Sequence, residues 1–416
     1  MIFKKKISIY LIFMSTLFVG LMLGENSSGG AKIDYEYLIP FVKNFSINFT
    51  TGLNSFISNS GSIIHSPVFY ILVGYFLKIT KSILFIKIFY ILISSIIPYI
   101  FYLILKNKYK IQNDYIFLFS LLIFFSSYFR TSAIWILGDN LSLLFFSLSV
   151  LFFLKTKFEK SKVLNFYLCI IFLIFCCYIR YYYFLFSIYF LFVFYKNVNF
   201  RFFMKLILVG FLLSLPAIIY FYYIILNYDF LNTVSNYKNF NYYSNTLIIL
   251  SIFLFYFIPF IFFQFLSIVN YYKKNYKIIL ILLFPFLLIL LLDIFFFSNL
   301  INFSNIGGGV FLKISYLMNF NSSVFLSIAS FISLIFIDYS FKKNRIENYL
   351  LLIILVLCFP MITIFQKYLD PLFFIFFFGL INSDFFRDIL IKRSVSILFL
   401  YGYFFSFLLF STFYYL

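Results

Sequence analysis

The chain has 416 residues, of which 64% are hydrophobic and 11% are charged, and its mean hydropathy is +1.05. So few polar residues do not cover a hydrophobic core, which excludes a soluble globular fold and predicts an all-α polytopic membrane protein. The formal net charge of +19 is then explained by cytoplasmic loops rich in Lys and Arg, and no nucleic-acid partner is indicated.

The first apolar run covers residues 7–23 and follows three lysines at positions 4–6. It fits either a signal peptide or an uncleaved first span, and the absence of an A-x-A-like cleavage site favours the span. Its basic flank predicts a cytoplasmic N-terminus and an outer position for the residues that follow.

Residues 24–79 form the longest interval without a spanning-length apolar run, and we expect them to form an outer catalytic loop. Near the end of this loop, residues 66–79 are aromatic and amphipathic. At about 1.5 Å per residue they reach roughly 21 Å, short of the roughly 30 Å of a hydrocarbon core. They therefore predict a helix lying in the outer interface. Residues 33–45, interrupted by Pro40, predict a second such helix.

Twelve further apolar runs bring the prediction to about thirteen transmembrane helices, several of which need their flanks to cross the membrane. The runs cover residues 84–105, 115–129, 141–154, 164–179, 183–195, 206–226, 247–269, 278–297, 316–339, 349–366, 372–381 and 395–416.

The charges agree with this topology. If residues 66–79 do not cross, the inner connections are the N-terminus and residues 106–110, 155–162, 196–205, 273–277, 342–345 and 387–393. These hold 22 of the 32 Lys and Arg residues, against 10 outside. The positive-inside rule is met only in this frame. No internal repeat or solvated domain is visible, so we predict one transmembrane domain over residues 1–416.

Acidic residues of the outer side are the candidates for chemistry. Asp34 and Glu36 open the first outer loop in GGAKIDYEY, and Asp139 lies in the next one, RTSAIWILGDN. The alternative interpretations are a surface carboxylate for Asp34 and a helix cap for Asp139. Trp135 in the same loop is expected to be an interfacial anchor. Acids beside the inner basic clusters, Asp338 among them, are expected to be solvated counter-charges.

Cations on the outer side are the candidates for holding an anion. Arg180 begins a tight turn, RYYY, and Lys367 lies beside Tyr368 in QKYLDP. An Arg at such a turn fits either snorkelling or a phosphate ligand. The only histidine, His65, precedes a proline at a helix start and fits either a capping or a substrate-binding residue.

These features occur in an order that resembles the GT-C superfamily of membrane glycosyltransferases. They are a first span, an outer loop with an early acid, an interfacial helix entered through HSPVFYILVGYFLKI, and an acid in the next outer loop, AIWILGDNLSLLFF. The resemblance is closest to the protein-mannosyltransferase and aminoarabinose-transferase group, and it covers the first half of the chain. The usual first-loop signature is a tighter acidic pair than DYE.

The resemblance implies an inverting transfer of a sugar from a polyprenyl-phosphate donor to a lipid, glycan or protein acceptor, on the outer face of a bacterial inner membrane. Asp34 would be the general base, with Glu36 as the alternative, and Asp139 its orienting or metal-binding partner. Arg180 and Lys367 would hold the donor phosphate. Further substrate contacts are expected from His65, Arg130 and Tyr368. No cofactor is certain, and a divalent metal remains open.

Two other functions compete with this interpretation. A flippase or transporter of lipid-linked glycans typically carries charges within its spans and shows repeated halves. In this sequence no repeat is seen, and the outer charges gather in loops. An O-antigen-type polymerase would favour a large outer loop late in the chain.

Overall fold

The computed structural model describes residues 2–58, 66–111, 113–158, 163–227, 242–296, 303, 307–360 and 363–415, and every regular element among them is a helix. Seven of these helices are long and apolar enough to cross a membrane, or eight if one bent pair is a single span. The chain is therefore a polytopic helical membrane protein, as predicted. The figure of about thirteen spans stays a prediction.

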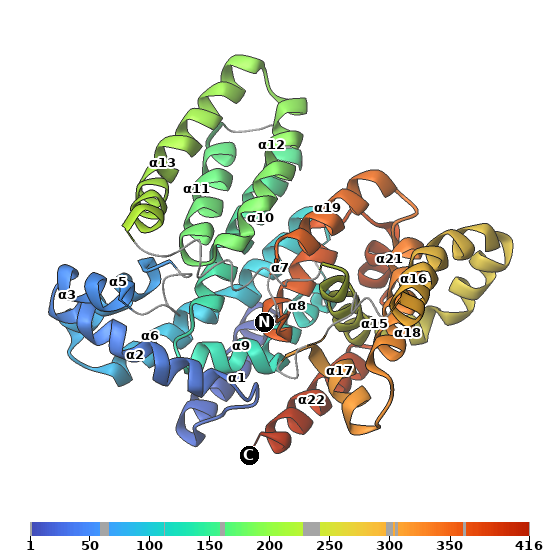
Figure 1. Cartoon of the computed structure of the whole chain (residues 1–416), viewed down its shortest axis with the longest axis horizontal. Coiled ribbons are helices and arrows are strands. Elements are labelled where there is room, and N and C mark those ends of the chain that lie inside the picture. Colours follow the sequence, from blue (N-terminus) through green and yellow to red (C-terminus); the bar gives the residue numbers. More distant parts are fainter. Residues whose placement is uncertain are drawn as a thin grey trace. The chain divides into compact units, whose positions relative to one another are not determined.

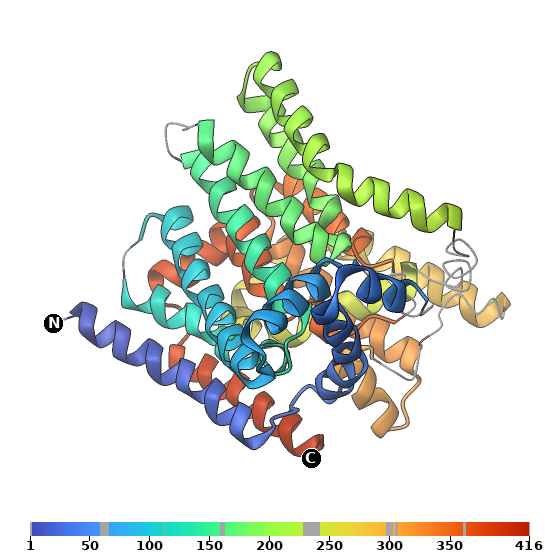
Figure 2. The same ribbon diagram turned by 90° about the vertical axis from the view of Figure 1, so that its left-hand side faces the viewer.

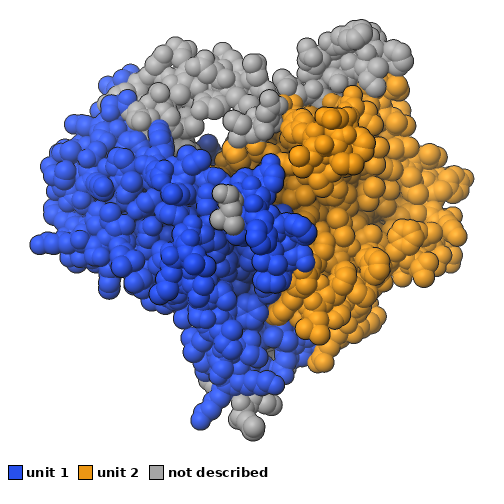
Figure 3. All heavy atoms as spheres, turned by 90° about the horizontal axis from the view of Figure 1, so that it is seen from below, with its two compact units in different colours: residues 1–236, 404–416 blue, residues 237–403 orange. Residues whose placement is uncertain are grey.

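The chain divides into two compact units, Met1–Asn236 with Phe404–Leu416, and Tyr237–Tyr403 (Figure 3). The prediction of one membrane domain stays untested. In the first unit the helices are α1 (Ile2–Leu23), α2 (Ala31–Ile47), α3 (Phe49–Ile57), α5 (Val68–Thr80), α6 (Ile83–Ser94), α7 (Ile96–Tyr109), α8 (Asp114–Ser120), η1 (Leu121–Phe125), α9 (Ser127–Ile134), α10 (Gly138–Phe158), α11 (Val163–Ile179), η2 (Tyr181–Leu185), α12 (Phe186–Asn197) and α13 (Phe200–Asn227).

The second unit contains α15 (Tyr242–Lys274), α16 (Tyr276–Phe296), α17 (Gly309–Leu317), α18 (Ser322–Ser340), α19 (Arg345–Leu357), η3 (Gln366–Tyr368), α20 (Leu372–Phe374), η4 (Ile375–Leu380) and α21 (Asp384–Lys392). Helix α22 (Ile397–Tyr414) contributes to both units. Within the first unit, α10 packs on α11 and α13 packs on α11 and α12 (Figures 1 and 2). Most of α13 is exposed, as expected for a helix that faces lipid.

Both segments predicted as interfacial are helices, α2 and α5, and they pack on one another. They cross closely at Gly74, where a Cβ would lie 2.6 Å from the Cβ of Phe45. Helix α5 ends at Thr80 and is capped by Lys81, whose φ is +53°. The side chain of the next residue, Ser82, accepts a hydrogen bond from the amide of Phe85 and caps the start of α6. The predicted position of α2 and α5 in the outer interface stays a prediction.

Several predicted runs are divided by turns that hydropathy does not detect. The run 115–129 becomes α8, η1 and α9, which bend by 65° at Ser126. The run 316–339 breaks at Asn319, with φ of +55°, and helix α19 ends at Leu357, within the run 349–366. The prediction of residues 130–140 as a loop is wrong at both ends, because residues 130–134 belong to α9 and residues 138–140 to α10. The polar side chain of Ser126 caps α9, which explains the bend.

Predicted inner connections meet within each unit. In the first unit Lys6 forms an ion pair with Asp114 at 2.8 Å, and the charge of Lys157 acts on Lys108. In the second unit Lys342 lies over the ring of Tyr271, at the end of α15. These contacts bring some of the segments that the positive-inside rule assigned to the inner side together within each unit, and the orientation itself stays a prediction.

Candidate functional site

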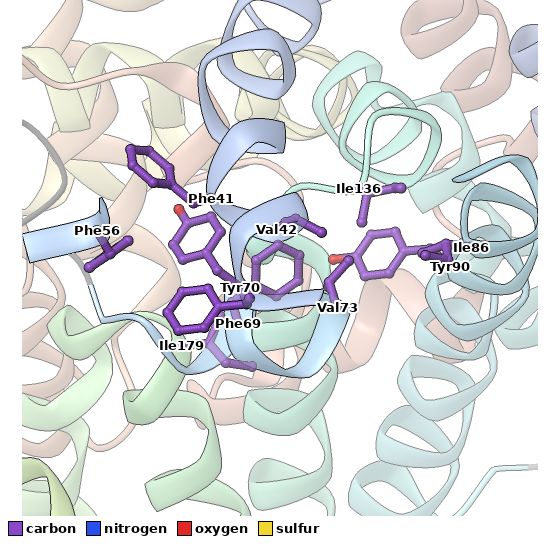
Figure 4. Close-up of a cluster of buried hydrophobic side chains, with 11 residues drawn as sticks. Phe41, Val42, Phe56, Phe69, Tyr70, Val73, Ile86, Tyr90, Ile136 and Ile179 are labelled. Carbon is purple, nitrogen blue, oxygen red and sulfur yellow. The ribbon is translucent and has the colours of Figure 1, made fainter. Parts of the chain in front are cut away.

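The centre of the candidate site is Tyr70 in α5, which is 4% exposed within a hydrophobic cluster formed mainly by α2, α3, α5 and α6 (Figure 4). Its ring centroid lies 5.3 Å from that of Phe56, 5.6 Å from Phe69 and 6.3 Å from Phe41. Burial raises the pKa of the Tyr70 phenol to about 12. This phenol therefore stays neutral at physiological pH, as a hydrogen-bonding group in an apolar surrounding.

Three charged groups act on the Tyr70 hydroxyl. After burial itself, the Arg180 guanidinium lowers the pKa of Tyr70, and the carboxylates of Asp139 and Asp34 raise it. These residues come from three different segments, α2, the start of α10 and the turn after α11. Three of the residues that the sequence predicted for catalysis or substrate binding therefore lie near enough for their charges to act on one buried phenol.

The two acids of the DYE motif differ in their surroundings. Asp34 is half-buried in the first turn of α2, where its amide donates to the carbonyl of Gly30 at 2.9 Å. Glu36 is exposed and is not among the charges that act on Tyr70. Residues two apart on a helix point to different faces. Asp34 is thus the acid of this pair that faces the buried cluster.

Asp139 and Arg180 form a bidentate ion pair. The Nε and Nη2 atoms of Arg180 donate to Oδ1 and Oδ2 of Asp139, each at 3.0 Å. The two side chains are only 14% and 16% exposed, so solvent screens the pair weakly. This fork fixes the plane of the guanidinium. Asp139, expected as a partner of Asp34, is here the direct partner of Arg180.

The third nitrogen of the guanidinium, Nη1, makes no hydrogen bond to any residue that the structure describes. Arg180 has Tyr70 and Tyr182 as its other electrostatic neighbours. An oriented cation whose Nη1 has no hydrogen-bond acceptor among the described residues, beside neutral phenols, is suited to binding an anion such as a phosphate.

The backbone around Asp139 is fixed from both sides. The Tyr90 hydroxyl donates to the carbonyl of Leu137 and accepts from the amide of Leu141. The buried Asn140 side chain donates to the carbonyl of Phe129 at 2.9 Å, which ties the start of α10 to α9. These hydrogen bonds hold the carboxylate that orients Arg180, so the site is built on rigid elements.

A second bidentate ion pair joins Arg130 in α9 to Glu25, which lies two residues after the end of α1. Arg130 Nε lies 2.8 Å from Glu25 Oε1, and Nη2 lies 2.5 Å from Oε2. The remaining donors of Arg130 reach the hydroxyl and carbonyl of Thr16. All three nitrogens therefore have protein acceptors, and the pair braces the first loop. The predicted contact of Arg130 with substrate stays untested.

Trp135 contributes to the same brace. It is 9% exposed, and its Nε1 donates to the carbonyl of Glu25 at 2.8 Å. The expected role as an interfacial anchor stays a prediction. Lys87 lies over Trp135 and over Tyr35, at 4.2 and 4.6 Å from the ring centroids. The sequence signal for Lys87 was available, since it is a cation inside a predicted apolar run.

Comparisons with family models, curated proteins and solved structures find no match for this chain. The resemblance to the GT-C superfamily therefore rests on the motifs and their order alone.

The remaining predicted site residues are His65, Lys367 and Tyr368. His65 lies outside the described residues. Lys367 and Tyr368 belong to the second unit, where the Lys367 ammonium lies 5.1 Å from the Phe365 ring centroid and 5.8 Å from that of Tyr368. Their predicted contact with substrate stays a prediction.

Within the described residues, no three His, Cys, Asp or Glu side chains gather closely enough to hold a metal ion. Both carboxylate oxygens of Asp139, the expected metal ligand, are bound by Arg180. No step is therefore assigned to a divalent cation.

One expectation about the inner acids is wrong. Asp338, expected to be a solvated counter-charge, is 3% exposed. It accepts hydrogen bonds from Tyr272 and Tyr349, each at 2.9 Å, and from Arg345 at 3.3 Å. A buried carboxylate needs such donors because its water is lost on folding. The sequence hides this, since the donors lie on two other helices, Tyr272 on α15 and Arg345 and Tyr349 on α19.

Proposed function

We propose that the protein is a membrane glycosyltransferase of the GT-C type, which transfers a sugar from a polyprenyl-phosphate donor to an acceptor on the outer face of a bacterial inner membrane. The observation that carries the proposal is the convergence of Asp34, Asp139 and Arg180 on Tyr70. It supplies a half-exposed carboxylate and an oriented cation at one buried cluster, the two charges that such a transfer needs.

In this proposal Asp34 is the general base. Its carboxylate takes the proton of the acceptor hydroxyl while the acceptor oxygen bonds to the anomeric carbon of the sugar. The bond from that carbon to the phosphate oxygen breaks, and the polyprenyl phosphate leaves with the electron pair. A single displacement of this kind inverts the anomeric configuration.

Arg180 would stabilise the phosphate as its negative charge grows, through Nη1 and the outward face of the guanidinium. Asp139 would be a positioning residue, because it holds the guanidinium in one plane from behind. The neutral Tyr70 hydroxyl would complete the polar surface between base and cation. The apolar cluster around it limits the access of water, which strengthens the electrostatic interactions of both charged groups with the substrate.

The first test compares Asp34→Asn with Glu36→Gln in cells that lack the native gene copy. Mass analysis of surface glycans and lipids identifies the product and the accumulated donor. We expect Asp34→Asn to lower transfer by about 10² to 10⁴, the usual loss for a general base. Glu36→Gln is the matched control, because it removes an acid two residues away on the exposed face of the same helix.

The outcome also separates this proposal from its competitors. Normal product with Asp34→Asn and loss with Glu36→Gln would transfer the role of base to Glu36. Normal product in the double variant Asp34→Asn, Glu36→Gln would refute the proposal that the protein is a glycosyltransferase. If the protein is a flippase, an inactive variant should leave the lipid-linked glycan on the inner leaflet with its chemical composition unchanged. The same mass analysis, combined with sided labelling, detects this.

A further inference from the structure

The second unit contains an apolar groove along α15, bounded by α18 and by the start of α16. Its volume is about 390 Å³, within the range of ligand pockets. Its lining residues are Ile261, Phe265, Ile268, Val269, Tyr272, Lys273, Ile279, Ile332, Ile335 and Phe336. All but Tyr272 and Lys273 are hydrophobic, and these two lie at the end of the groove nearest the C-terminus of α15.

The groove has the length of one membrane leaflet. From Ile261 to Lys273 the helix rises about 18 Å, at about 1.5 Å per residue. Half of a hydrocarbon core of roughly 30 Å is about 15 Å. Helices α15 and α18 are both candidate membrane spans. A single acyl chain lying along α15 would therefore place its headgroup beside Lys273.

Four cations gather at this end of the groove. Lys273 and Lys274 end α15, Lys277 follows in the first turn of α16, and Lys342 lies just beyond α18. The Lys342 ammonium lies 3.7 Å from the ring centroid of Tyr271 and 3.6 Å from that of Tyr339. All four lysines are exposed, and none forms an ion pair with a residue that the structure describes.

The nearby acids are engaged mainly by other groups, although the charge of Asp338 also acts on Lys342. Asp338 is buried and already bound by Tyr272, Tyr349 and Arg345. Asp384 pairs with Lys343 at 3.2 Å. The mouth of the apolar groove therefore carries an excess of positive charge. A ligand that fits it combines an anionic head with an apolar chain.

We propose that this groove is a binding site for an anionic phospholipid, with one acyl chain along α15 and the phosphate among Lys273, Lys274, Lys277 and Lys342. Basic pockets between membrane helices select anionic headgroups in this way. The site lies at the end of the second unit where predicted inner connections meet, so the lipid belongs to the inner leaflet if the predicted topology holds. The proposal is independent of the glycosyltransferase activity.

The test measures lipid binding to the purified full chain in neutral detergent, by native mass spectrometry during titration. The probes are phosphatidylglycerol and phosphatidylcholine with the same acyl chains, and inorganic phosphate alone. We expect the native protein to retain phosphatidylglycerol with a clear preference. In the triple variant Lys273→Ala, Lys274→Ala, Lys277→Ala the affinity for phosphatidylglycerol should fall by roughly 100-fold, from the effect of each lysine at an anionic lipid.

Two further variants make the result specific. Ile332→Trp fills the groove at a position that is 43% exposed and so tolerates a larger side chain; it should weaken phosphatidylglycerol binding with the lysines intact. The triple variant Lys196→Ala, Arg201→Ala, Lys205→Ala removes the same charge from another predicted inner connection, and should leave binding unchanged. Thermal unfolding of each variant confirms that it folds.

Several results would overturn the proposal. Equal retention of phosphatidylglycerol by the native protein and the Lys273, Lys274, Lys277 variant would show that these cations are not the headgroup site. An equal loss in the control triple variant would reduce the effect to net charge. The groove would have no role if inorganic phosphate displaced phosphatidylglycerol as strongly as the lipid itself does. The same conclusion would follow if Ile332→Trp bound phosphatidylglycerol as well as the native protein.

Discussion

The ion pair between Asp139 and Arg180 offers the sharpest test of the candidate site. If Arg180 binds the donor phosphate and Asp139 only orients it, both Arg180→Ala and Asp139→Asn should weaken the use of donor. Neither should change the dependence on acceptor. Arg180→Lys should recover only part of the loss, because an ammonium lacks the planar fork.

The expected magnitudes follow from the geometry. Losing a hydrogen bond to a charged group costs about 1.5–3 kcal/mol, so Arg180→Ala should weaken the apparent donor affinity by about 10- to 150-fold. Asp139→Asn also leaves a cation without its partner, which in a fully buried pair destabilises a protein by about 3–5 kcal/mol. Since 14% and 16% of these side chains remain exposed, we expect about 2–3 kcal/mol after screening by solvent.

The chain contains a matched control. Glu25 and Arg130 form an equally bidentate pair, with side chains 10% and 8% exposed, but the Arg130 nitrogens all have protein acceptors. Glu25→Gln should therefore lower thermal stability as Asp139→Asn does, with donor affinity nearly unchanged. The assay is donor titration at fixed acceptor in purified, lipid-reconstituted protein, using the donor identified by mass analysis.

The reasoning is refuted if Arg180→Ala and Asp139→Asn both leave the apparent donor affinity unchanged. It is refuted equally if Glu25→Gln shifts donor affinity as much as they do, because the effect would then be a general consequence of a broken pair. A double variant of Asp139 and Arg180 should lose no more donor affinity than Arg180→Ala alone, since the two residues act as one unit.

Three further predictions concern topology and packing. Cysteines placed at Lys78 and Lys108 should react from opposite sides of the membrane, and labelling of both from one side would disprove the frame. Gly74→Val should destabilise the protein by about 1–3 kcal/mol in thermal unfolding, because its Cβ would lie 2.6 Å from a carbon of α2. Asp338→Asn should cost about 1.5–3 kcal/mol, through weaker hydrogen bonds in a buried site. Asp384→Asn, in a pair with both side chains more than half exposed, should cost under about 1 kcal/mol in the same measurement.

Parts of the candidate site were predictable from the sequence, and other parts were not. Asp34, Asp139 and Arg180 stand out because charged residues are rare in such an apolar chain, and each lies in a predicted outer loop or turn. The choice between Asp34 and Glu36 was open, because the DYE motif does not say which helical face packs on Tyr70. The partner of Asp139 was also open, since Arg180 lies 41 residues away and reaches it only when α10 and α11 pack.

The sequence by itself determined that this protein is helical and crosses a membrane. The length and hydropathy of an apolar run are local properties, and they decide whether a segment can span the bilayer as a helix. It also determined that α2 and α5 are helices too short to be ordinary spans. Only the tertiary structure decided where apolar runs bend, that Asp338 is buried, and that Arg130 braces Glu25 while Arg180 keeps a nitrogen free of hydrogen bonds to the described residues. Those outcomes depend on which side chains from distant segments meet, and the free energy of a charge inside a protein is set by such partners rather than by its neighbours in the chain.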